Sequence, residues 1–446
     1  MRLSERALVT DPGVAATYGI DSSLGSTAPE TFTVVRARDV GDVVEVLRHA
    51  AAERIPVVPQ GARTGLAGGS AATEGSIVLN LEALDEVTEL DEVERFAVVQ
   101  PGVVTNDLKA AAAKVGLAYP PDPASAAWCT VGGNIATNAG GLCCVKYGVT
   151  ADYVRGLDVV LAGGETMRTG RRTAKGVAGF DLTGLFVGSE GLLGVVTSAV
   201  VRLIAAPDPA LTALATFASL DAATAGILAL RADPYGPSLL ELLDADTIVA
   251  VQAVADFGFP ADCAAVLIVQ SDRPGHVGED VHRYASLLEA AGATDVAVAD
   301  DAQEAEALMA GRRALHVAHE TKGPHFTEDV CVPVARLADL IRAGHEIGAR
   351  RGVDVTLSGH AGDGNLHPCF FFAAGDADSM HRAEQAFDDL VHVALALGGT
   401  ITGEHGVGSL KMRWLPQELG EAEMARQRAV KAVFDPLGIM NPGKVL

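Results

Sequence analysis

The chain has 446 residues, of which 49% are apolar and 20% charged, and its formal net charge is −23. This length predicts two or three domains, and so apolar a chain is neither disordered nor collagenous. The acidic balance repels phosphate backbones, and no Lys/Arg run interrupts it, so we expect no nucleic-acid partner.

The sequence indicates a protein that stays inside the cell. MRLSERALVTDPG lacks the apolar run of a secretory signal peptide. The longest uncharged stretch, between Asp122 and Lys146, is rich in Gly, Asn, Thr and Ser, so we interpret it as a loop system and not a membrane span. We expect a cytoplasmic protein, and peripheral attachment to the inner membrane face through a partner stays open. The six cysteines lie without a C-x-x-C pair, which favours free buried thiols over disulfides or a zinc cluster.

The first ordered segment has the pattern strand, helix, strand. FTVVR from Phe32 is extended, Asp39 is a candidate N-cap for an amphipathic helix, and IPVV up to Val58 is extended again. Short elements follow: strands at 76–81 and 96–102, a helix over 105–115, a glycine-rich stretch at 131–141, a hairpin turning at 163–164 and a strand at 192–204. We therefore expect an α+β domain over roughly residues 30–206.

A change of pattern at 205–211, AAPDPAL, marks the best domain boundary, because two prolines interrupt it. From 214 to 340 apolar strands alternate with Ala-rich amphipathic helices, which predicts a second α+β domain. The chain then continues with a helix around 380–397, the loop GGTITGEHGVGSLK and the tail DPLGIMNPGKVL.

Three glycine-rich segments are candidates for holding a large anionic ligand. VVPQGARTGLAGGS (57–70) runs from a strand into a loop whose N–H groups can turn toward one anion, as a pyrophosphate requires. Its spacing matches neither the Rossmann dinucleotide pattern nor the ATPase P-loop, and a plain structural turn is the alternative. PPDPASAAWCTVGGNIATNAGG (120–141) adds close backbone approach and many hydrogen-bond donors, and VGSEGLLGVVT (187–197) is a tight turn into a strand. Two glycine-rich loops of this kind on one domain, 57–70 and 120–141, imply that the ligand is a dinucleotide.

In this order and spacing, the three segments resemble the FAD-binding domain of the vanillyl-alcohol-oxidase superfamily. From about residue 30 onward the chain is similar to the FAD-linked D-2-hydroxyacid dehydrogenases, which include bacterial glycolate oxidase flavoprotein subunits, D-lactate dehydrogenases and D-2-hydroxyglutarate dehydrogenases. The resemblance implies an α+β fold with an FAD-binding domain at 1–206, an α+β cap domain for substrate at 207–398, and a C-terminal segment, 399–446, that returns to the flavin.

The resemblance also assigns cofactor residues. It implies that 60–65 wrap the pyrophosphate, that 121–141 line the ribityl and isoalloxazine region, and that 190–197 meet the adenosine half. No histidine occurs between His49 and His276, so we expect non-covalent FAD. The residues so assigned are Pro59, Gln60, Gly61, Ala62, Arg63, Thr64, Gly65, Pro121, Asp122, Ser125, Gly132, Gly133, Asn134, Thr137, Asn138, Gly140, Gly141, Glu190, Gly194, Val196 and Asn441.

A fourth motif, SGHAGDGNLHP (358–368), predicts a hairpin that carries two histidines. Asp363-Gly364 suits the centre of a two-residue turn, where both positions need a positive φ. This register pairs His360 with His367 on one side of the ribbon, with Cβ atoms about 5 Å apart. Two imidazoles so placed can share one metal ion; a surface hairpin that carries two histidines by chance is the alternative.

A third ligand should come from elsewhere, and Glu404 in TGEHGVG is the natural choice. Adjacent side chains of an extended loop point apart, so Glu404 could reach the metal while His405 faces the substrate. Without further information, a Glu404-His405 pair beside glycines is typical of a loop that has no functional role. The resemblance implies that His360, His367 and Glu404 bind a divalent metal, zinc or alternatively manganese or iron, and that His405 is the catalytic base.

A fifth motif, GRRALHVAHETKG (311–323), predicts a helix with two arginines. An arginine fork binds a carboxylate bidentately, and the resemblance places the substrate arginine at Arg312, whereas Arg313 is expected to be a surface charge. The alternative interpretation is that Arg312 and Arg313 are both surface charges. Met309 replaces a frequent Trp of the relatives and Thr327 replaces a lysine of the 2-hydroxyglutarate branch, which argues against a C5 dicarboxylate substrate.

We therefore expect an FAD enzyme that oxidises a D-2-hydroxy acid, D-lactate or glycolate, to the 2-oxo acid, with Arg312, His360 and His367 at the substrate. The alternatives are a flavin subunit of a glycolate oxidase that needs an iron–sulfur partner, and a D-2-hydroxyglutarate dehydrogenase. The electron acceptor would be a quinone, a cytochrome, an electron-transfer flavoprotein or an iron–sulfur subunit. A homodimer is the default expectation.

Overall fold

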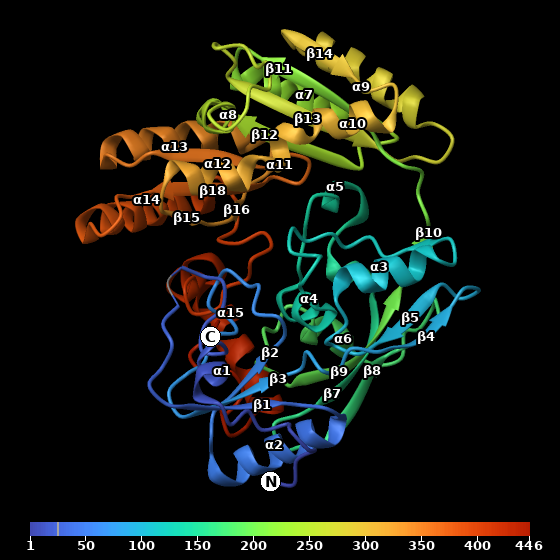
Figure 1. Cartoon of the computed structure of the whole chain (residues 1–446), viewed down its shortest axis with the longest axis vertical. Coiled ribbons are helices and arrows are strands. Elements are labelled where there is room, and N and C mark those ends of the chain that lie inside the picture. Colours follow the sequence, from blue (N-terminus) through green and yellow to red (C-terminus); the bar gives the residue numbers. More distant parts are fainter. Residues whose placement is uncertain (25) are drawn as a thin grey trace. The chain divides into compact units, whose positions relative to one another are not determined.

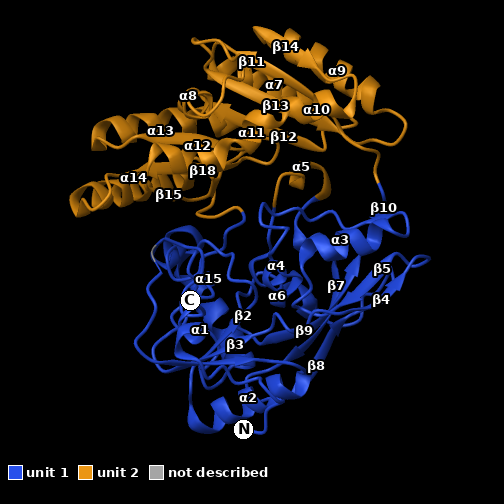
Figure 2. Ribbon diagram, in the orientation of Figure 1, with its two compact units in different colours: residues 1–140, 148–206, 404–446 blue, residues 141–147, 207–403 orange. Residues whose placement is uncertain are grey.

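The computed structural model describes residues 1–24 and 26–446 (Figure 1). The chain forms two compact units, shown in blue and orange in Figure 2. Unit 1 comprises residues 1–140, 148–206 and 404–446, and unit 2 comprises residues 141–147 and 207–403. Among the described residues, no helix combines the length and apolar character needed to cross a membrane.

Unit 1 begins with the predicted strand–helix–strand segment. β1 (Phe32–Arg36) leads into α2 (Val40–Glu53), whose first turn is capped by the Asp39 carboxylate at 3.0 Å from the Asp42 amide, and then into β2 (Val57–Gln60). β3 (Ser76–Asn80) lies between the two strands and pairs with both in parallel. The apolar face of α2 packs on this small sheet in a core that includes Val43, Val46 and Leu47.

A second sheet of unit 1 is antiparallel, with strand order β4–β5–β9–β7–β8 in the described part of the chain. The predicted hairpin is present, because β7 and β8 pair from Val160 and Thr166 outward. Buried and partly exposed residues alternate along β9, as in a strand with one face in a core. The bounds are β4 (Val87–Asp91), β5 (Phe96–Val99), β7 (Val154–Val160), β8 (Thr166–Gly170) and β9 (Val195–Arg202), with β6 (Leu117–Ala118) paired to β10 (Ile204–Ala205).

The glycine-rich stretch contains helices, so its interpretation as a loop system is wrong. α4 (Val131–Thr137) begins at Thr130, whose hydroxyl accepts from the Gly133 amide at 3.3 Å, and ends at Asn138 with φ 52°. Glycine costs about 1 kcal/mol in a helix relative to alanine. At Gly132 a glycine is needed because the packing is tight: an added Cβ would lie 2.5 Å from the Pro101 side chain. The other helices of unit 1 are α1 (Pro12–Ala16), α3 (Thr105–Ala113), α6 (Leu182–Phe186) and the 3₁₀ turns η1 (Thr150–Asp152) and η3 (Met412–Trp414), and α5 (Cys144–Tyr147) belongs to unit 2.

Unit 1 ends with α15 (Leu415–Phe434), which the sequence pattern does not predict. Only Leu415 and Met424 of this helix are buried, so it has no apolar stripe to detect. After it, the Asp435 carboxylate accepts from the amides of Ile439 and Met440 at 3.1 and 2.8 Å, and Met440 bridges to Val57 of β2. The C-terminal segment therefore returns to the first sheet.

Unit 2 is built on one antiparallel sheet of eight strands within residues 207–403, all of which are described. The strand order is β14–β11–β13–β12–β17–β18–β15, and β16 also pairs with β18. Its strands are β11 (Leu211–Phe217), β12 (Leu239–Asp244), β13 (Ala265–Ser271), β14 (Asp295–Val298), β15 (His325–Thr327), β16 (Val330–Cys331), β17 (Val355–His360) and β18 (Asn365–Phe371). The alternation of strands and helices predicted here is confirmed.

Helices cover both faces of this sheet. Leu357 faces α13 (Leu337–Arg351), and Phe370 packs on Phe387 of α14 (Ala377–Ala396), while α7 (Leu220–Ala232) contacts both α13 and α9 (Val277–Ala290). On the other face Thr356 contacts His319 of α12 (Leu315–Lys322). This second face, on which the side chains of Glu241 and His360 also lie, is covered by α8 (Ala245–Gln252), α10 (Ala302–Leu308), α11 (Ala310–Arg313) and α12. A 3₁₀ turn, η2 (Val334–Arg336), precedes α13.

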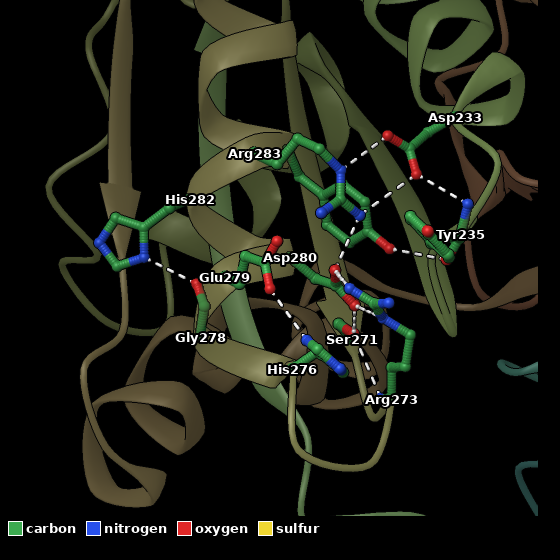
Figure 3. Close-up of polar contacts among 11 residues, drawn as sticks. Asp233, Tyr235, Ser271, Arg273, His276, Gly278, Glu279, Asp280, His282 and Arg283 are labelled. Carbon is green, nitrogen blue, oxygen red and sulfur yellow. Dashed lines mark hydrogen bonds and ion pairs between the residues drawn. The ribbon is translucent and has the colours of Figure 1, made fainter.

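An ion-pair network fixes α9 to the sheet (Figure 3). Arg273 donates to both oxygens of Asp280 at 2.8 and 2.6 Å, and Arg283 donates to Asp233 at 2.8 Å. Burial alone would raise the pKa of Asp280, but hydrogen bonds from Arg273, Ser271 and Arg283 lower it to about 2. The carboxylate is therefore ionised at neutral pH.

Candidate active site

Unit 1 contains a cavity of about 250 Å³ to which all three glycine-rich segments contribute. Sixteen predicted residues line it: Pro59, Gln60, Gly61, Ala62, Arg63, Thr64, Gly65, Ser125, Gly132, Gly133, Asn134, Thr137, Gly140, Glu190, Gly194 and Val196. Pro59 and Val196, which are 137 residues apart in sequence, thus line one space.

The loop after β2 is held open by its own polar contacts. The Gln60 amide donates to the carbonyls of Tyr18 and Ser70 at 2.8 and 2.6 Å. Gly61 sits so close to the neighbouring segment that an added Cβ would lie 2.4 Å from the Thr130 hydroxyl. Arg63, with φ 61°, places its guanidinium 4.4 Å from the Tyr18 ring centre. These contacts fix the loop without filling the cavity.

The 187–197 turn is held by the C-terminal segment of unit 1. Buried Glu190 accepts from the amides of Val407 and Gly408 at 2.8 and 2.9 Å, and burial raises the pKa of this carboxyl group. The Asn441 amide donates to the Glu190 and Gly69 carbonyls at 2.7 and 2.9 Å. Asn441 thus joins two loops that line the cavity and does not itself line it.

Four other predicted cofactor residues also lie outside the lining. Asp122 forms an ion pair with Lys109, and Asn138 ends α4 and accepts from the Ala151 amide at 2.8 Å. Pro121 lies just before the lining residues 123–125, and Gly141 belongs to unit 2. The lining includes residues that sequence reasoning missed, among them Leu81, Pro101, Thr130 and Phe186. Their residue types are those of ordinary core and cap positions, so no sequence signal separates them.

Glu404 and His405 line the same cavity of unit 1. The chain bends here, and the Glu404 Oε1 and His405 Nε2 atoms are 3.7 Å apart. The prediction that these two side chains diverge is therefore wrong, because the segment is not extended. Gly406 follows with φ 85°, and a Cβ there would lie 2.9 Å from the Glu190 carboxylate.

In unit 2 the two predicted histidines lie on one hairpin, but in a different register. His360 pairs with Asn365 and His367 pairs with Ser358, so residues 361–364 form a four-residue connection. The predicted two-residue turn is wrong, because of its central residues only Gly364 has a positive φ, 92°, and its amide bonds the His360 carbonyl at 3.0 Å. A shift of two residues keeps both side chains on the same face.

The two imidazoles converge despite the changed register. Their Nε2 atoms are 3.3 Å apart, and His360 is buried. Two nitrogens bound to one tetrahedral zinc ion at its usual bond lengths would be about 3.3 Å apart. The separation therefore fits two ligands of a single ion, and it equally fits a hydrogen bond between the two rings.

A carboxylate that sequence reasoning missed holds this pair. Glu241 of β12 is fully buried, and it accepts from His360 Nδ1 at 2.5 Å and from Arg312 Nε at 2.6 Å. Burial alone would raise its pKa, but His360 and Arg312 lower the pKa of Glu241 to about 2. The available signal was a lone acidic residue inside the apolar strand LLELLD.

The two arginines differ as predicted in their surroundings. The Arg312 side chain is 19% exposed and pairs with Glu241, whereas Arg313 is 48% exposed and pairs with Glu306 at 2.7 Å. With its Nε bound by a buried carboxylate, Arg312 keeps terminal nitrogens that can meet a second, incoming carboxylate.

Comparison with known proteins decides the family. The model of the FAD-linked oxidase C-terminal domain matches residues 206–445, and that of an FAD-binding domain matches residues 33–170. The chain belongs to the FAD-linked oxidases. A glycolate oxidase subunit GlcD of Bacillus subtilis is 42% identical over 92% of this chain and 88% of its own length. A D-lactate dehydrogenase of Anaerostipes hadrus is 36% identical over 94% of this chain and 90% of its own.

Solved structures show the fold of this FAD-linked oxidase. p-Cresol methylhydroxylase with bound substrate superposes with a TM-score of 0.80 at 17% identity over 99% of this chain and 94% of its own. A 4-ethylphenol oxidase from Gulosibacter chungangensis gives 0.79 at 19% identity over 99% and 94%. The predicted α+β fold is thereby confirmed.

The cavity residues of this FAD-linked oxidase fit its cofactor. The buried Gln60 Oε1 atom has no hydrogen-bond partner among the described residues, so it is available to a ligand's donor. A Cβ at Gly65 would meet no atom within 4 Å, so this backbone borders open space. Such a lining allows a large polar dinucleotide to approach the main chain closely.

Proposed function

We propose that this FAD-linked oxidase converts a D-2-hydroxy acid, D-lactate or glycolate, into the 2-oxo acid. The observation that carries the proposal is the linked set Arg312–Glu241–His360–His367 in unit 2, which joins a carboxylate-binding side chain to a pair of metal-ligand type. The relatives named glycolate oxidase subunit and D-lactate dehydrogenase support the same substrate class.

In this proposal Arg312 binds the substrate carboxylate. Glu241 orients the guanidinium through Nε and leaves the fork of terminal nitrogens for the ligand. The sequence resemblance places Thr327 at the position of a lysine in the 2-hydroxyglutarate branch. A small monocarboxylate therefore suits the chain better than a C5 dicarboxylate.

His360 and His367 would hold a divalent metal, zinc or alternatively manganese or iron, and the sequence resemblance adds Glu404 as a further ligand. The 3.3 Å separation of the two Nε2 atoms and the hydrogen bond from His360 Nδ1 to Glu241 support this assignment. Such an ion supplies Lewis acidity that lowers the pKa of the substrate hydroxyl.

His405 is the proposed base. It takes the hydroxyl proton while the hydride on C2 leaves as the C=O double bond forms, which accounts for both hydrogens of the oxidation. Non-covalently bound FAD supplies the hydride acceptor, its N5 atom. The protein's part is to bind the carboxylate, orient C2 and hold the proton.

Turnover with an artificial dye acceptor tests the proposal. The flavin-loaded protein is assayed with D-lactate, glycolate, D-2-hydroxyglutarate and D-malate, before and after a chelator and after re-addition of zinc or manganese. We expect turnover of D-lactate or glycolate that chelation abolishes and one metal restores. Turnover that persists after demonstrated metal removal would contradict the metal's role.

A second candidate is favoured by the relatives' names. Both the Bacillus subtilis relative and an Escherichia coli relative, 36% identical over 92% of this chain and 83% of its own length, are named as glycolate oxidase subunits. As such a subunit, the chain would pass electrons to an iron–sulfur partner, and otherwise to a quinone, a cytochrome or an electron-transfer flavoprotein. Flavin reduction by glycolate without turnover of the isolated chain on any dye would favour this candidate.

A further inference from the structure

Unit 2 contains a second group of side chains of metal-ligand type. His319 of α12, His325 of β15 and Cys369 of β18 each offer one ligand atom, and these atoms all lie within 4.8 Å of one another. None of the three has a part in the proposed oxidation. His319 and Cys369 are buried and His325 is partly exposed, so the group has one side toward solvent.

His319 is oriented by a contact on each ring nitrogen. Its Nε2 atom is 3.1 Å from the Thr356 hydroxyl, and its Nδ1 atom is 3.3 Å from the Cys369 sulfur. A nitrogen and a sulfur bound to the same tetrahedral zinc ion would be about 3.6 Å apart. The observed distance needs only a few tenths of an ångström of adjustment to admit an ion.

His325 presents the complementary arrangement. Its Nδ1 atom is 2.8 Å from the Gly323 carbonyl, which can only accept, so Nδ1 carries the proton and Nε2 carries the lone pair. Metal-binding histidines commonly donate their other nitrogen to a backbone carbonyl or another oxygen in this way. Each imidazole therefore has one nitrogen tied to an oxygen, which leaves the other nitrogen as its ligand atom.

The sulfur completes the group from the neighbouring strand. β15 pairs with β18 so that Thr327 lies opposite Cys369, and the Thr327 hydroxyl is 3.4 Å from the sulfur. The Phe371 ring packs on both imidazoles, with ring centres 5.7 Å from His319 and 5.2 Å from His325. Side chains of three elements thus hold the ligand atoms together, with the Phe371 ring against both imidazoles.

We infer that His319 Nδ1, His325 Nε2 and Cys369 Sγ form a metal site of their own, which takes a thiophilic divalent ion of the zinc class. One sulfur and two nitrogens are the donors that zinc and Co²⁺ accept in tetrahedral sites, and the fourth position is left to water. On binding, the Cys369 thiol loses its proton to solvent and its sulfur becomes the ligand. The site does not depend on the function proposed for the His360–His367 pair.

Cobalt spectroscopy distinguishes this site from any other in the chain. Metal-free, flavin-loaded protein is titrated with Co²⁺ and difference spectra are recorded against the same sample before addition. A thiolate-to-cobalt charge-transfer band in the near ultraviolet reports a cysteine ligand, whereas ions bound by His360 and His367 give none. We expect the band to be complete once two equivalents are added, because the His360–His367 pair also takes up Co²⁺, and we expect added Zn²⁺ to abolish the band.

Variants show which side chains produce the charge-transfer band. Cys369→Ser and His325→Asn should abolish it, and Cys331→Ser, which alters another cysteine of the same unit, should keep it. Thr356→Val should weaken Co²⁺ binding 10- to 100-fold, the usual effect of removing an outer partner of a metal-bound histidine. His325 is partly exposed, so His325→Asn decides the matter if Cys369→Ser does not fold. Absence of the band in the unaltered protein, or its survival in folded His325→Asn, would show that the three side chains form a hydrogen-bonded cluster only.

Discussion

Glu241 links the polar side chains of His360 and Arg312 in unit 2. It is fully buried, ionised, and shared between His360 and Arg312. A buried carboxylate with two charge-assisted partners orients both, and removing its charge weakens both of these hydrogen bonds.

Glu241→Gln should lower kcat for D-lactate or glycolate about 10- to 100-fold and weaken metal binding by a similar factor. The amide keeps the size of the side chain but cannot accept from both partners as a carboxylate does. Turnover and metal content are to be measured together. Glu306→Gln, which alters an exposed partner of Arg313, is the matched control. Unchanged kcat and unchanged metal content in Glu241→Gln would remove Glu241 from the site.

Arg312→Lys should lower kcat/KM about 100-fold, because lysine keeps the charge but loses the fork and the Nε contact with Glu241. Arg313→Lys is the neighbouring control and should behave as the unaltered protein, since its side chain is about half exposed. Steady-state kinetics with each acid measure the difference. Equal losses in the two variants would contradict the distinct roles of the two arginines.

At the scale of elements, β12, α8 and α13 meet at one histidine. His345 of α13 places Nε2 2.9 Å from Asp244 and Nδ1 3.1 Å from Asp246. Asp244 also caps α8 through the Thr247 amide and accepts from the Leu357 amide. Hydrogen bonds to Asp244 and then Asp246 raise the pKa of His345 to about 10.

This contact should make stability fall with rising pH. A pKa raised above its unfolded value of about 6.5 gives stability that is complete below pH 6.5 and is lost as the pH rises toward 10. His345→Asn should cost about 1–2 kcal/mol at pH 6 and markedly less at pH 9.5, a magnitude discounted for the partial exposure of the ring. Urea unfolding at the two pH values measures it, with exposed His282→Asn as the control. An equal cost at both pH values would contradict the account.

Elements with a clear periodic pattern were predictable, and those held by tertiary contacts were not. β1, α2 and β2 follow from their apolar periodicity and the Asp39 cap. The sequence pattern did not predict α15, because this helix buries only two side chains. It did not predict α4 either, because a glycine of this helix allows close packing against Pro101. In the His360–His367 hairpin the consecutive residues Asp363 and Gly364 favoured a two-residue turn. The structure has a longer turn, which is closed by the hydrogen bond from the Gly364 amide to the His360 carbonyl.

At the scale of the whole molecule, the two units hold different parts of the proposed chemistry. Unit 1 carries the cavity that fits FAD, together with Glu404 and His405, and unit 2 carries Arg312, Glu241, His360 and His367. The motifs of both units were visible in sequence, because glycine loops and paired histidines have local signatures. Glu241, at a distance of 119 residues from His360, has none beyond its buried strand.

Asn441 tests how far the C-terminal segment supports the cavity of unit 1. Asn441→Ala leaves the Gly69 and Glu190 carbonyls without their amide donor, which should cost about 1–3 kcal/mol and weaken FAD binding. Flavin content after dialysis and the thermal midpoint measure both effects. Gln427→Ala, on the exposed face of α15, is the amide control. Full flavin retention in Asn441→Ala would show that the loops hold without this residue.

The central claim, oxidation of a D-2-hydroxy acid by the bound flavin, is tested most directly by a single anaerobic mixing experiment. The flavin-loaded, metal-supplemented protein is mixed with D-lactate, L-lactate and glycolate, and the absorbance at about 450 nm is followed. We predict bleaching by D-lactate or glycolate and none by L-lactate. A flavin that is reduced by dithionite, but by neither D-lactate nor glycolate, would contradict the claim.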